Sequence, residues 1–410
     1  MPIKVLAQEE TAAGPITCEN VHDTVNRAEQ GDRFKRTLCA DVVALDQMLV
    51  YNRFGSFNPY GMIYALRRDV VGTGTAPRRL TADQCDDSLG IESHGTGLAA
   101  GEVRLRDCKR PRPLTLRANV GDILHVRLTN VLRPQVPGFS ETFCKTPAQA
   151  PGQPYGALLH GVRGAVSEGS KTQVAHGEAA CLPARGTPGS EADGNWPRTR
   201  GANMAIQGLT AFGLRDGRMV EAPDACKGLA AIAPGAGIDC YYMIEREGPF
   251  FMASTGAPSG GQGDGGSLVH GLFGAVMAEP EHSRWYRSQV SARAFREVWK
   301  PAGNGVRHAV RGADIGDASR YEALAVDPVS RRKLPLLNML HRVDPMDRGT
   351  AALRETRPDA FFADGVFELV HSDLNVIVHR GKRDSRDSRD TAAPLSFREF
   401  SVFFHDEIKS

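Results

Sequence analysis

The stretch Leu114-Thr-Leu-Arg-Ala-Asn-Val-Gly-Asp-Ile-Leu-His-Val-Arg-Leu-Thr-Asn130 carries the clearest structural signal in the chain. Aliphatic and polar side chains alternate from Leu124 to Thr129, and a period of two is typical of a strand with one buried face. The pattern predicts a hairpin of two strands around a turn at Asn119–Asp122, with the side chain of His125 facing solvent.

Strand-like patterns recur on both sides of this stretch. Glycine (44 residues) and proline (25 residues) are abundant, which fits short strands joined by many turns. The sequence therefore predicts an all-β chain. The further strands are expected at Val42–Leu45, Met48–Tyr51, Gly61–Leu66, Asp239–Glu245, Pro249–Ser254 and Leu272–Pro280.

The domain organisation follows from where these patterns stop and resume. Two stretches rich in glycine, proline and charge interrupt the strand series and are expected to be insertions. We expect an N-terminal segment at 1–40, one domain at 41–280 with insertions at about 69–109 and 133–200, a linker with local structure at 281–394, and the first strand of an incomplete second domain at 395–410.

Charge and hydropathy limit the classes of partner. Lys and Arg total 50 against 48 for Asp and Glu, so the balance gives no reason to expect nucleic acid or an anionic membrane as partner. No window of about 18 apolar residues appears, so no membrane span is expected. The first ten residues lack the apolar core of a secretory signal. Small neutral molecules and proteins remain open as partners.

Eight cysteines form an even set without a C-x-x-C pair, which disfavours zinc ribbons and thioredoxin-like chemistry. Such a set is compatible with disulfides in an exported protein and with reduced thiols in the cytoplasm. The spacing does not decide between the two compartments, and it leaves the disulfide connectivity open.

Four motifs and a terminal strand, read in order, resemble the strand series of the first domain of a multicopper oxidase. The resemblance implies a cupredoxin-like Greek-key β-sandwich with long insertions and a mixed C-terminal linker. The terminal strand looks like the opening strand of the second domain of that family. The motifs are Asn119–Asn130, Asn203–Leu209, Glu247–Thr255 and Gly271–Pro280, and the terminal strand is Phe397–Glu407.

Copper is the cofactor that the resemblance implies. Members of the family hold a trinuclear copper centre with His-x-His pairs, two of them in the first domain, because imidazole is a suitable ligand for copper. The matching positions here are Ala205 and Gln207 in one pair and Ala253 and Thr255 in the other. None is an imidazole, so we expect this chain not to bind the copper of the family.

The resemblance implies a role inside a larger oxidase. We expect the chain to be the N-terminal scaffold portion of a multicopper-oxidase-like protein, with copper sites outside this chain oxidising a metal ion or small reductant with dioxygen. Its partners would be further cupredoxin domains of a longer chain or another subunit, in the periplasm or outside the cell. The chain is not expected to catalyse the oxidation alone. The alternative is a non-catalytic cupredoxin-like module that binds a protein or supports an assembly.

Three other residues are candidate metal ligands. His371 and Asp373 share a face if 367–378 is a strand, and His405 can join them only through the tertiary fold. The alternative is that they are ordinary polar residues of strand faces.

Three further motifs are better explained by ordinary structural roles than by metal or nucleotide binding. Cys18 and His22 offer a thiol and an imidazole without a second pair to complete a metal site, so a polar N-terminal tail is expected. His270 is expected to be a hydrogen-bonded loop histidine. The glycines of 261–266 fit a dinucleotide fingerprint, but the following residues read as a strand where a helix is needed.

Overall fold

The structure is a computed structural model of the whole chain. The residues that it describes are 11–12, 16–50, 57–58, 60–73, 98–106, 109–134, 197, 199–258, 265–288, 324–326, 333–335, 337–343, 365–380 and 396–404. Most of the expected insertions at about 69–109 and 133–200 lie outside these residues.

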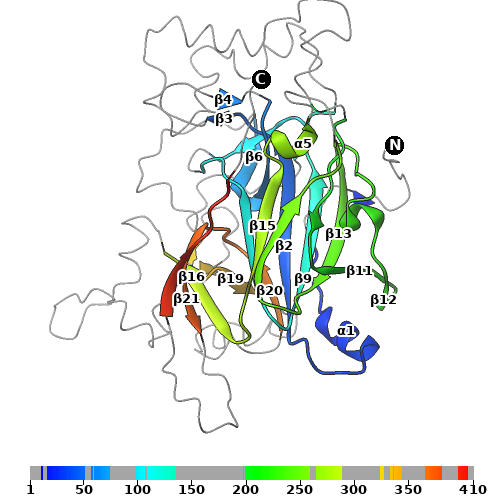
Figure 1. Cartoon of the computed structure of the whole chain (residues 1–410), viewed down its shortest axis with the longest axis vertical. Coiled ribbons are helices and arrows are strands. Elements are labelled where there is room, and N and C mark those ends of the chain that lie inside the picture. Colours follow the sequence, from blue (N-terminus) through cyan, green and yellow to red (C-terminus); the bar gives the residue numbers. More distant parts are fainter. Residues whose placement is uncertain are drawn as a thin grey trace, which may run out of the picture.

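A nine-stranded sheet forms one layer of the fold, in the order β12-β11-β13-β9-β2-β20-β19, with β1 added to β13 and β5 added to β2 (Figure 1). Its parallel pairs are β2 with β9 and β2 with β20. The strands are β1 (Thr11–Ala12), β2 (Arg36–Asp46), β5 (Met62–Leu66), β9 (Asp122–Asn130), β11 (Thr210–Arg215), β12 (Arg218–Glu221), β13 (Ala236–Met243), β19 (Leu340–Arg342) and β20 (Gly365–Leu369).

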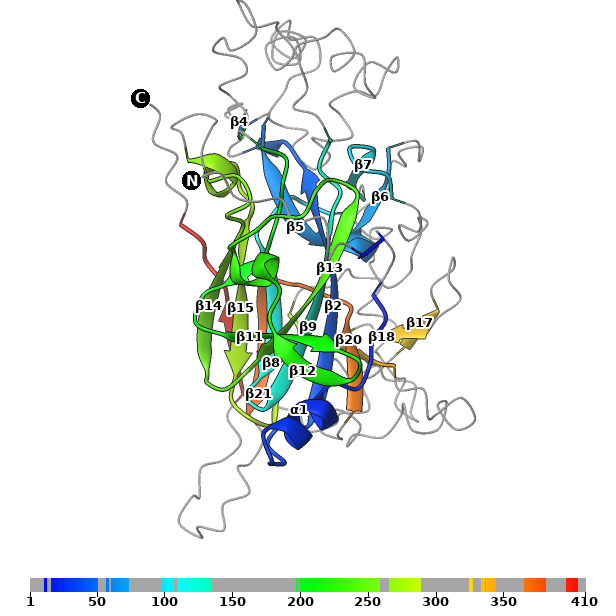
Figure 2. The same ribbon diagram turned by 90° about the vertical axis from the view of Figure 1, so that its right-hand side faces the viewer.

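A four-stranded sheet in the order β10-β14-β15-β8 forms the facing layer (Figure 2). Its strands are β8 (Leu114–Asn119), β10 (Ala205–Ile206), β14 (Gly248–Ala253) and β15 (Phe273–Glu279). Aliphatic side chains of both sheets, such as Leu38, Leu116, Val126 and Val276, belong to one buried cluster. The expected all-β sandwich is confirmed, and its mixture of parallel and antiparallel pairs is consistent with a cupredoxin-like sandwich.

The expected hairpin at 114–130 is wrong, because its two strands join different sheets. β8 pairs in parallel with β15, whereas β9 pairs with β2 and β13. The chain crosses from one sheet to the other at Val120–Gly121, where Gly121 has φ of 90°. The backbone N–H of Asn119 donates to Asp122 Oδ2 at 2.7 Å, and the N–H of Gly121 donates to the Ile244 carbonyl at 2.9 Å. These bonds fix a bend between the sheets.

Both faces of β9 are buried, so the side chain of His125 does not face solvent as expected. Leu124 and Val126 point into the sandwich core, and this part of the prediction is confirmed. On the outer face, Ile123 packs against Val21 and Val25 of the N-terminal segment. That segment covers the outer face, and His125 is only 2% exposed.

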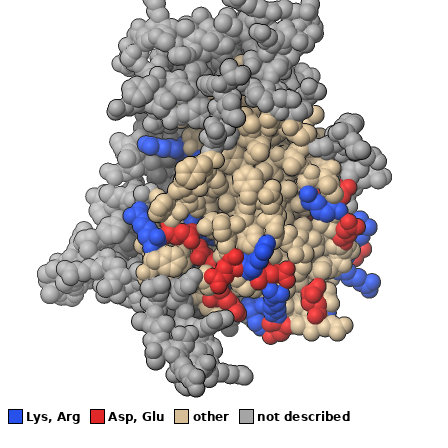
Figure 3. Space-filling view, viewed as in Figure 1, with Lys and Arg blue, Asp and Glu red and all other residues tan. Residues whose placement is uncertain are grey.

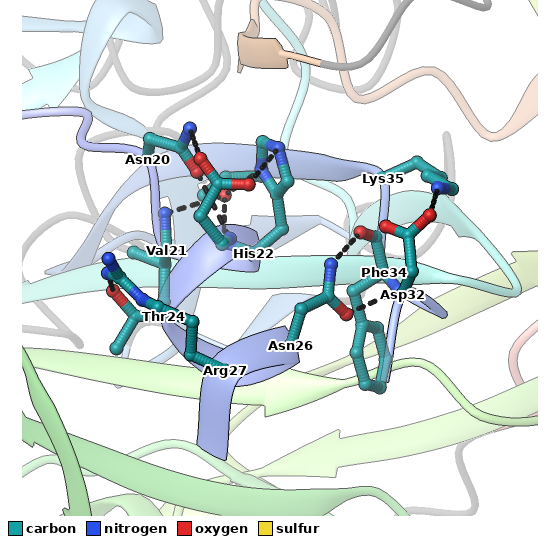
Figure 4. Close-up of polar contacts among 11 residues, drawn as sticks. Asn20, Val21, His22, Thr24, Asn26, Arg27, Asp32, Phe34 and Lys35 are labelled. Atoms are coloured by element: carbon teal, nitrogen blue, oxygen red, sulfur yellow. Dashed lines mark hydrogen bonds and ion pairs between the residues drawn. The ribbon is translucent and has the colours of Figure 1, made fainter. Parts of the chain in front are cut away.

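The N-terminal segment is held at the edge of the sandwich by helix α1 (His22–Ala28) and the turn after it. The side-chain amide of Asn26 donates to the Phe34 carbonyl at 2.6 Å and accepts from the Phe34 N–H at 2.9 Å (Figure 4). Val25 and Phe34 are buried in the same cluster as Ile123. The segment is therefore part of the packed structure.

The region 281–394, expected to be a linker, supplies strands to the sandwich. β20 pairs with β2, and β16 (Ser283–Arg287), β21 (Asn375–Arg380) and β22 (Ser396–Phe400) form a three-stranded sheet. Trp285 and Val376 of that sheet belong to the main core cluster. The terminal strand, expected to be the first strand of an incomplete second domain, pairs with β21. The domain boundaries remain a prediction, and strands on both sides of residue 281 share one core.

Shorter elements complete the described part of the chain. They are β3 (Leu49–Val50), β4 (Phe57–Asn58), η1 (Arg67–Asp69), β6 (Val70–Gly72), β7 (Val103–Leu105), η6 (Asp224–Lys227), α5 (Gly266–Val269), β17 (Leu324–Val326) and β18 (Lys333–Pro335). A disulfide joins Cys226 to Cys240, with their Cα atoms 5.5 Å apart.

The described surface and helices agree with the charge and hydropathy of the sequence. On the face in Figure 3, side chains of both signs intermingle over the lower half, which fits the near-zero charge balance. Among the described residues, no helix has the length and apolar character needed to cross a membrane.

Candidate functional site

The four positions at which the resemblance implies copper ligands lie on or beside the ladder between β10 and β14. Ala205 of β10 and Ala253 of β14 are direct partners across an antiparallel ladder. Gln207 follows β10, and its backbone N–H donates to the Phe251 carbonyl at 2.8 Å. Thr255 follows β14, and its backbone N–H donates to the side-chain oxygen of Asn203. Because the strands are antiparallel, Thr255 lies with Ala205 and Ala253 at one end of the β10–β14 ladder, and Gln207 lies past its other end.

Asn203 occupies the centre of the hydrogen bonds around this ladder end. Its buried side-chain oxygen accepts from the Thr255 N–H at 2.9 Å, and its amide donates to Thr255 Oγ1 at 3.0 Å and to the Ala230 carbonyl at 2.5 Å. The hydroxyl of Tyr64 donates to the Asn203 carbonyl. Thr255 Oγ1 donates to the Gly228 carbonyl at 2.6 Å. Protein groups thus satisfy the backbone N–H and the hydroxyl of Thr255.

Gly228 lies against the same ladder end. Its φ is 78°, and a Cβ atom there would lie 2.9 Å from Ala205 Cβ and 3.2 Å from Thr255 Oγ1. The backbone after η6 is therefore packed directly on the side chains of Ala205 and Thr255. Small side chains at these positions permit that approach.

These residues do not fit a copper centre. Copper in proteins takes imidazole nitrogen and thiolate or thioether sulfur. Ala205 and Ala253 have no atom that can bind a metal, and the Thr255 hydroxyl is engaged with Gly228. Within the described part of the chain, no group of three or more His, Cys, Asp or Glu side chains is arranged to hold a metal ion.

The other candidate ligands are not brought into one site. The strand expected at 367–378 is two strands, β20 and β21, and His371 and Asp373 lie in the loop between them. The Asp373 carboxylate is bound by Arg287 Nε at 2.7 Å and by Arg112 at 3.1 Å. His371 is buried, and His405 lies outside the described residues. The sequence suggested a shared face only because it predicted one continuous strand.

His270 and His22 are buried, and each lies beside a polar side chain of the fold. His270 is buried after α5, with its Nδ1 3.4 Å from the side-chain nitrogen of Asn58. His22 Nδ1 lies 3.1 Å from Thr37 Oγ1 at the start of α1. Residues Gly266–Val269, expected to be strand, form the short helix α5 before β15 begins at Phe273. Four residues are too few to give the nucleotide fingerprint its helix.

The sequence missed a buried polar cluster on the outer face of the large sheet. His125 Nε2 lies 2.9 Å from Asp239 Oδ1, and Arg127 donates to Asp239 Oδ2 at 2.6 Å. The ring of His125 stacks on Tyr241 with centroids 4.4 Å apart. Its Nδ1 lies 3.9 Å from the sulfur of Cys39. Alternation marked these positions as solvent-facing, and only the packing of the N-terminal segment reveals the cluster.

The surroundings of the cluster shift the pKa values of Asp239 and Cys39 in opposite directions. Burial acts to raise the pKa of Asp239, but the hydrogen bond and charge of His125, together with Arg127, hold that pKa below the ordinary aspartate value. Burial is the main cause of the raised pKa of the Cys39 thiol, and the negative charges of Glu368 and Asp239 raise it further. The cluster therefore contains an ionised carboxylate beside a protonated, buried thiol.

Comparisons with known proteins do not show a family for this chain. No family model matches the chain, and no curated protein matches it. Among solved structures, it is similar to a multi-copper oxidase from Pseudomonas thermotolerans, with 11% sequence identity and a TM-score of 0.23. The match covers 60% of this chain and 30% of that protein, so this chain spans less than a third of its length. Similarity at this level carries no functional argument.

Proposed function

We propose that this chain is a copper-free, cupredoxin-like sandwich that acts as a scaffold for copper-bearing cupredoxin domains of a multicopper-oxidase-like protein. The observation that carries the proposal is the β10–β14 ladder end, where Ala205 faces Ala253 and neither side chain can bind copper. Oxidation of a metal ion or small reductant with dioxygen would take place at copper sites outside this chain.

The hydrogen bonds at the ladder end support a structural role for it. Asn203 is fully buried and bonds to Thr255 and Ala230, so the positions that would hold ligands are cross-linked to the neighbouring loop. A buried amide with all these partners rigidifies its surroundings. The ladder end is therefore suited to holding the sandwich together.

An exposed apolar strand offers a surface for a copper-bearing domain. Phe400, Val402 and Phe404 are 66%, 57% and 96% exposed, and they alternate along and just beyond β22. Among the described strands, β22 lies at the edge of its sheet. Apolar side chains on an unpaired edge are suited to packing against another β-sandwich. We assign this surface to a partner cupredoxin domain, in the same longer chain or in another subunit.

Capture by the immobilised full chain tests the proposal. From an extract of the producing cells, it should retain a protein that contains His-x-His pairs and a His-Cys-His cluster and that holds copper by metal analysis. The double variant Phe400→Ser/Phe404→Ser should reduce this capture at least tenfold, while Leu229→Ser, at another exposed apolar residue, should leave it unchanged. Capture of copper-free proteins alone, or of no copper protein, would favour the non-catalytic binding module and overturn the scaffold role.

A further inference from the structure

The N-terminal segment runs antiparallel to β2 and is fixed to it at two places. The backbone N–H of Ile16 donates to Asp41 Oδ2 at 2.9 Å. The N–H groups of Val21 and His22, which begin helix α1 in Figure 4, donate to Thr37 Oγ1 at 3.0 and 3.1 Å. Because the two segments run in opposite directions, the residues midway between the two anchors lie opposite each other.

Cys18 and Cys39 are the residues midway between these anchors. The two anchors therefore place Cys18 opposite Cys39, and the side chain of Cys18 is one cause of the raised pKa of the Cys39 thiol. Neither cysteine takes part in a disulfide. Cys39 is fully buried, whereas Cys18 is partly exposed. A reagent in solution therefore reaches this pair through the sulfur of Cys18.

His125 is placed to accept a proton from the buried thiol. Cys39 and His125 are direct partners in the β2–β9 ladder, and Nδ1 of the ring lies 3.9 Å from the sulfur. Nε2 of the same ring lies 2.9 Å from the carboxylate of Asp239. A carboxylate accepts and does not donate, so Nε2 carries the hydrogen, and in the neutral ring Nδ1 carries the lone pair that faces Cys39.

We propose that Cys18 and Cys39 are an oxidisable dithiol, which closes a disulfide between the N-terminal segment and β2 with His125 as the proton acceptor. The oxidant is a low-molecular-weight disulfide. The Cys226–Cys240 disulfide of the same molecule requires an oxidant as well. The disulfide would link the N-terminal segment, which covers the His125 cluster, covalently to β2 of the large sheet.

The chemistry balances in two exchange steps. The Cys18 thiolate attacks the small disulfide, forms a mixed disulfide and releases one small thiolate. The sulfur of Cys39 then attacks the sulfur of Cys18 while its proton passes to His125 Nδ1, and the second small thiol leaves with that proton. Two protein thiols and one small disulfide thus become one protein disulfide and two small thiols.

The environment of Cys39 makes the reverse reaction slow. A reductant reaches only the sulfur of Cys18, so reduction must expel the sulfur of Cys39 into a buried site and return its proton from His125 Nδ1. The negative charges of Glu368 and Asp239 oppose a thiolate there. Thiols of high pKa are poor leaving groups in exchange. We therefore expect a disulfide that persists once it is formed.

Peptide mass spectrometry of the full chain tests the proposal. The reduced protein is treated with oxidised glutathione, unfolded, blocked with iodoacetamide and digested with trypsin. Tryptic peptides Val5–Arg27 and Thr37–Arg53 each contain one cysteine, Cys18 and Cys39 respectively. The expected product is these two peptides joined, lighter than their sum by two hydrogens, in most of the protein. In Cys18→Ser, Cys39 should remain unalkylated until the protein is unfolded.

The rate of closure tests the part assigned to His125. His125→Gln keeps an N–H that can donate to Asp239 and lacks a basic nitrogen, so closure should slow by about tenfold or more. His282→Gln, at a half-exposed histidine, is the matched control and should close at the wild-type rate. The inference is overturned if oxidation leaves both cysteines alkylated or joins either to another cysteine. It is also overturned if a chelator is needed to release the thiols, which would assign them to a metal.

Discussion

Ala205 and Ala253 are direct antiparallel partners at the end of the β10–β14 ladder. The resemblance to multicopper oxidases implies an imidazole in each His-x-His pair at these positions, yet the ladder end is closed by Gly228 and by the hydrogen bonds of Asn203. The ladder end is therefore a packed contact between two strands and the loop at Gly228. Its energetics are accessible through single substitutions.

Gly228→Ala should destabilise the fold by about 2–3 kcal/mol, because a Cβ combines a positive φ with a contact of 2.9 Å to Ala205. Gly217→Ala is the matched control, since Gly217 has φ of 69° but nothing within 4 Å of its Cβ position. The control should lose about 1 kcal/mol. Urea unfolding measures both, and equal losses would show that the ladder end does not confine residue 228.

Asp122→Asn should destabilise the bend between the sheets. The buried carboxylate accepts from Arg36 Nε at 2.8 Å and from the Asn119 N–H at 2.7 Å. Removing its charge leaves a buried guanidinium without its counter-ion, at a cost of about 3–5 kcal/mol. Glu245→Gln, in the exposed pair with Arg33, should cost less than about 1 kcal/mol. Chemical denaturation measures the unfolding free energy of both variants. Similar small losses in the two would contradict a stabilising role for the buried Arg36–Asp122 pair.

The contribution of Asp239 to stability should depend on pH. Its pKa is depressed in the folded state, so its ionisation stabilises the fold above the ordinary aspartate pKa of about 4 and ceases to do so as pH falls through the lower folded value. Asp239→Asn should therefore be less stable than wild type at neutral pH by about 1–3 kcal/mol. The difference should shrink toward about pH 2.

The control for this pH dependence is Asp32→Asn, because the Asp32 side chain is 82% exposed in its pair with Lys35. Its unfolding free energy should follow that of wild type across the same pH range. A constant difference between wild type and Asp239→Asn at every pH would contradict the ionic role of Asp239 in the His125 cluster.

Local patterns in the sequence predicted strands well and their partners poorly. Alternation located the strands at 114–130 and placed Leu124 and Val126 inside. The same alternation indicated a hairpin, because it carries no information on which sheet each strand joins. The split depends on distant groups, among them Ile244, whose carbonyl binds the Gly121 N–H.

The buried cluster around His125 shows the second limit. A period of two assigns one face to the core and leaves the other to solvent, unless another part of the chain covers it. Val21 and Val25 provide that cover here. Similarly, the strand-like pattern of 367–378 gave no sign of the loop that holds His371 and Asp373. The positions Ala205 and Ala253, in contrast, came from a resemblance across several motifs, and the structure brings them together.

Copper content after loading tests the central claim most directly. The full chain is incubated with copper, dialysed and analysed for bound metal, beside a variant with histidines at all four positions (Ala205→His, Gln207→His, Ala253→His and Thr255→His). We expect wild type to retain no stoichiometric copper and the variant to gain copper, with a two-site variant at Ala205 and Gln207 binding less tightly. Stoichiometric, tightly held copper in wild type, with oxidase turnover, would contradict the account.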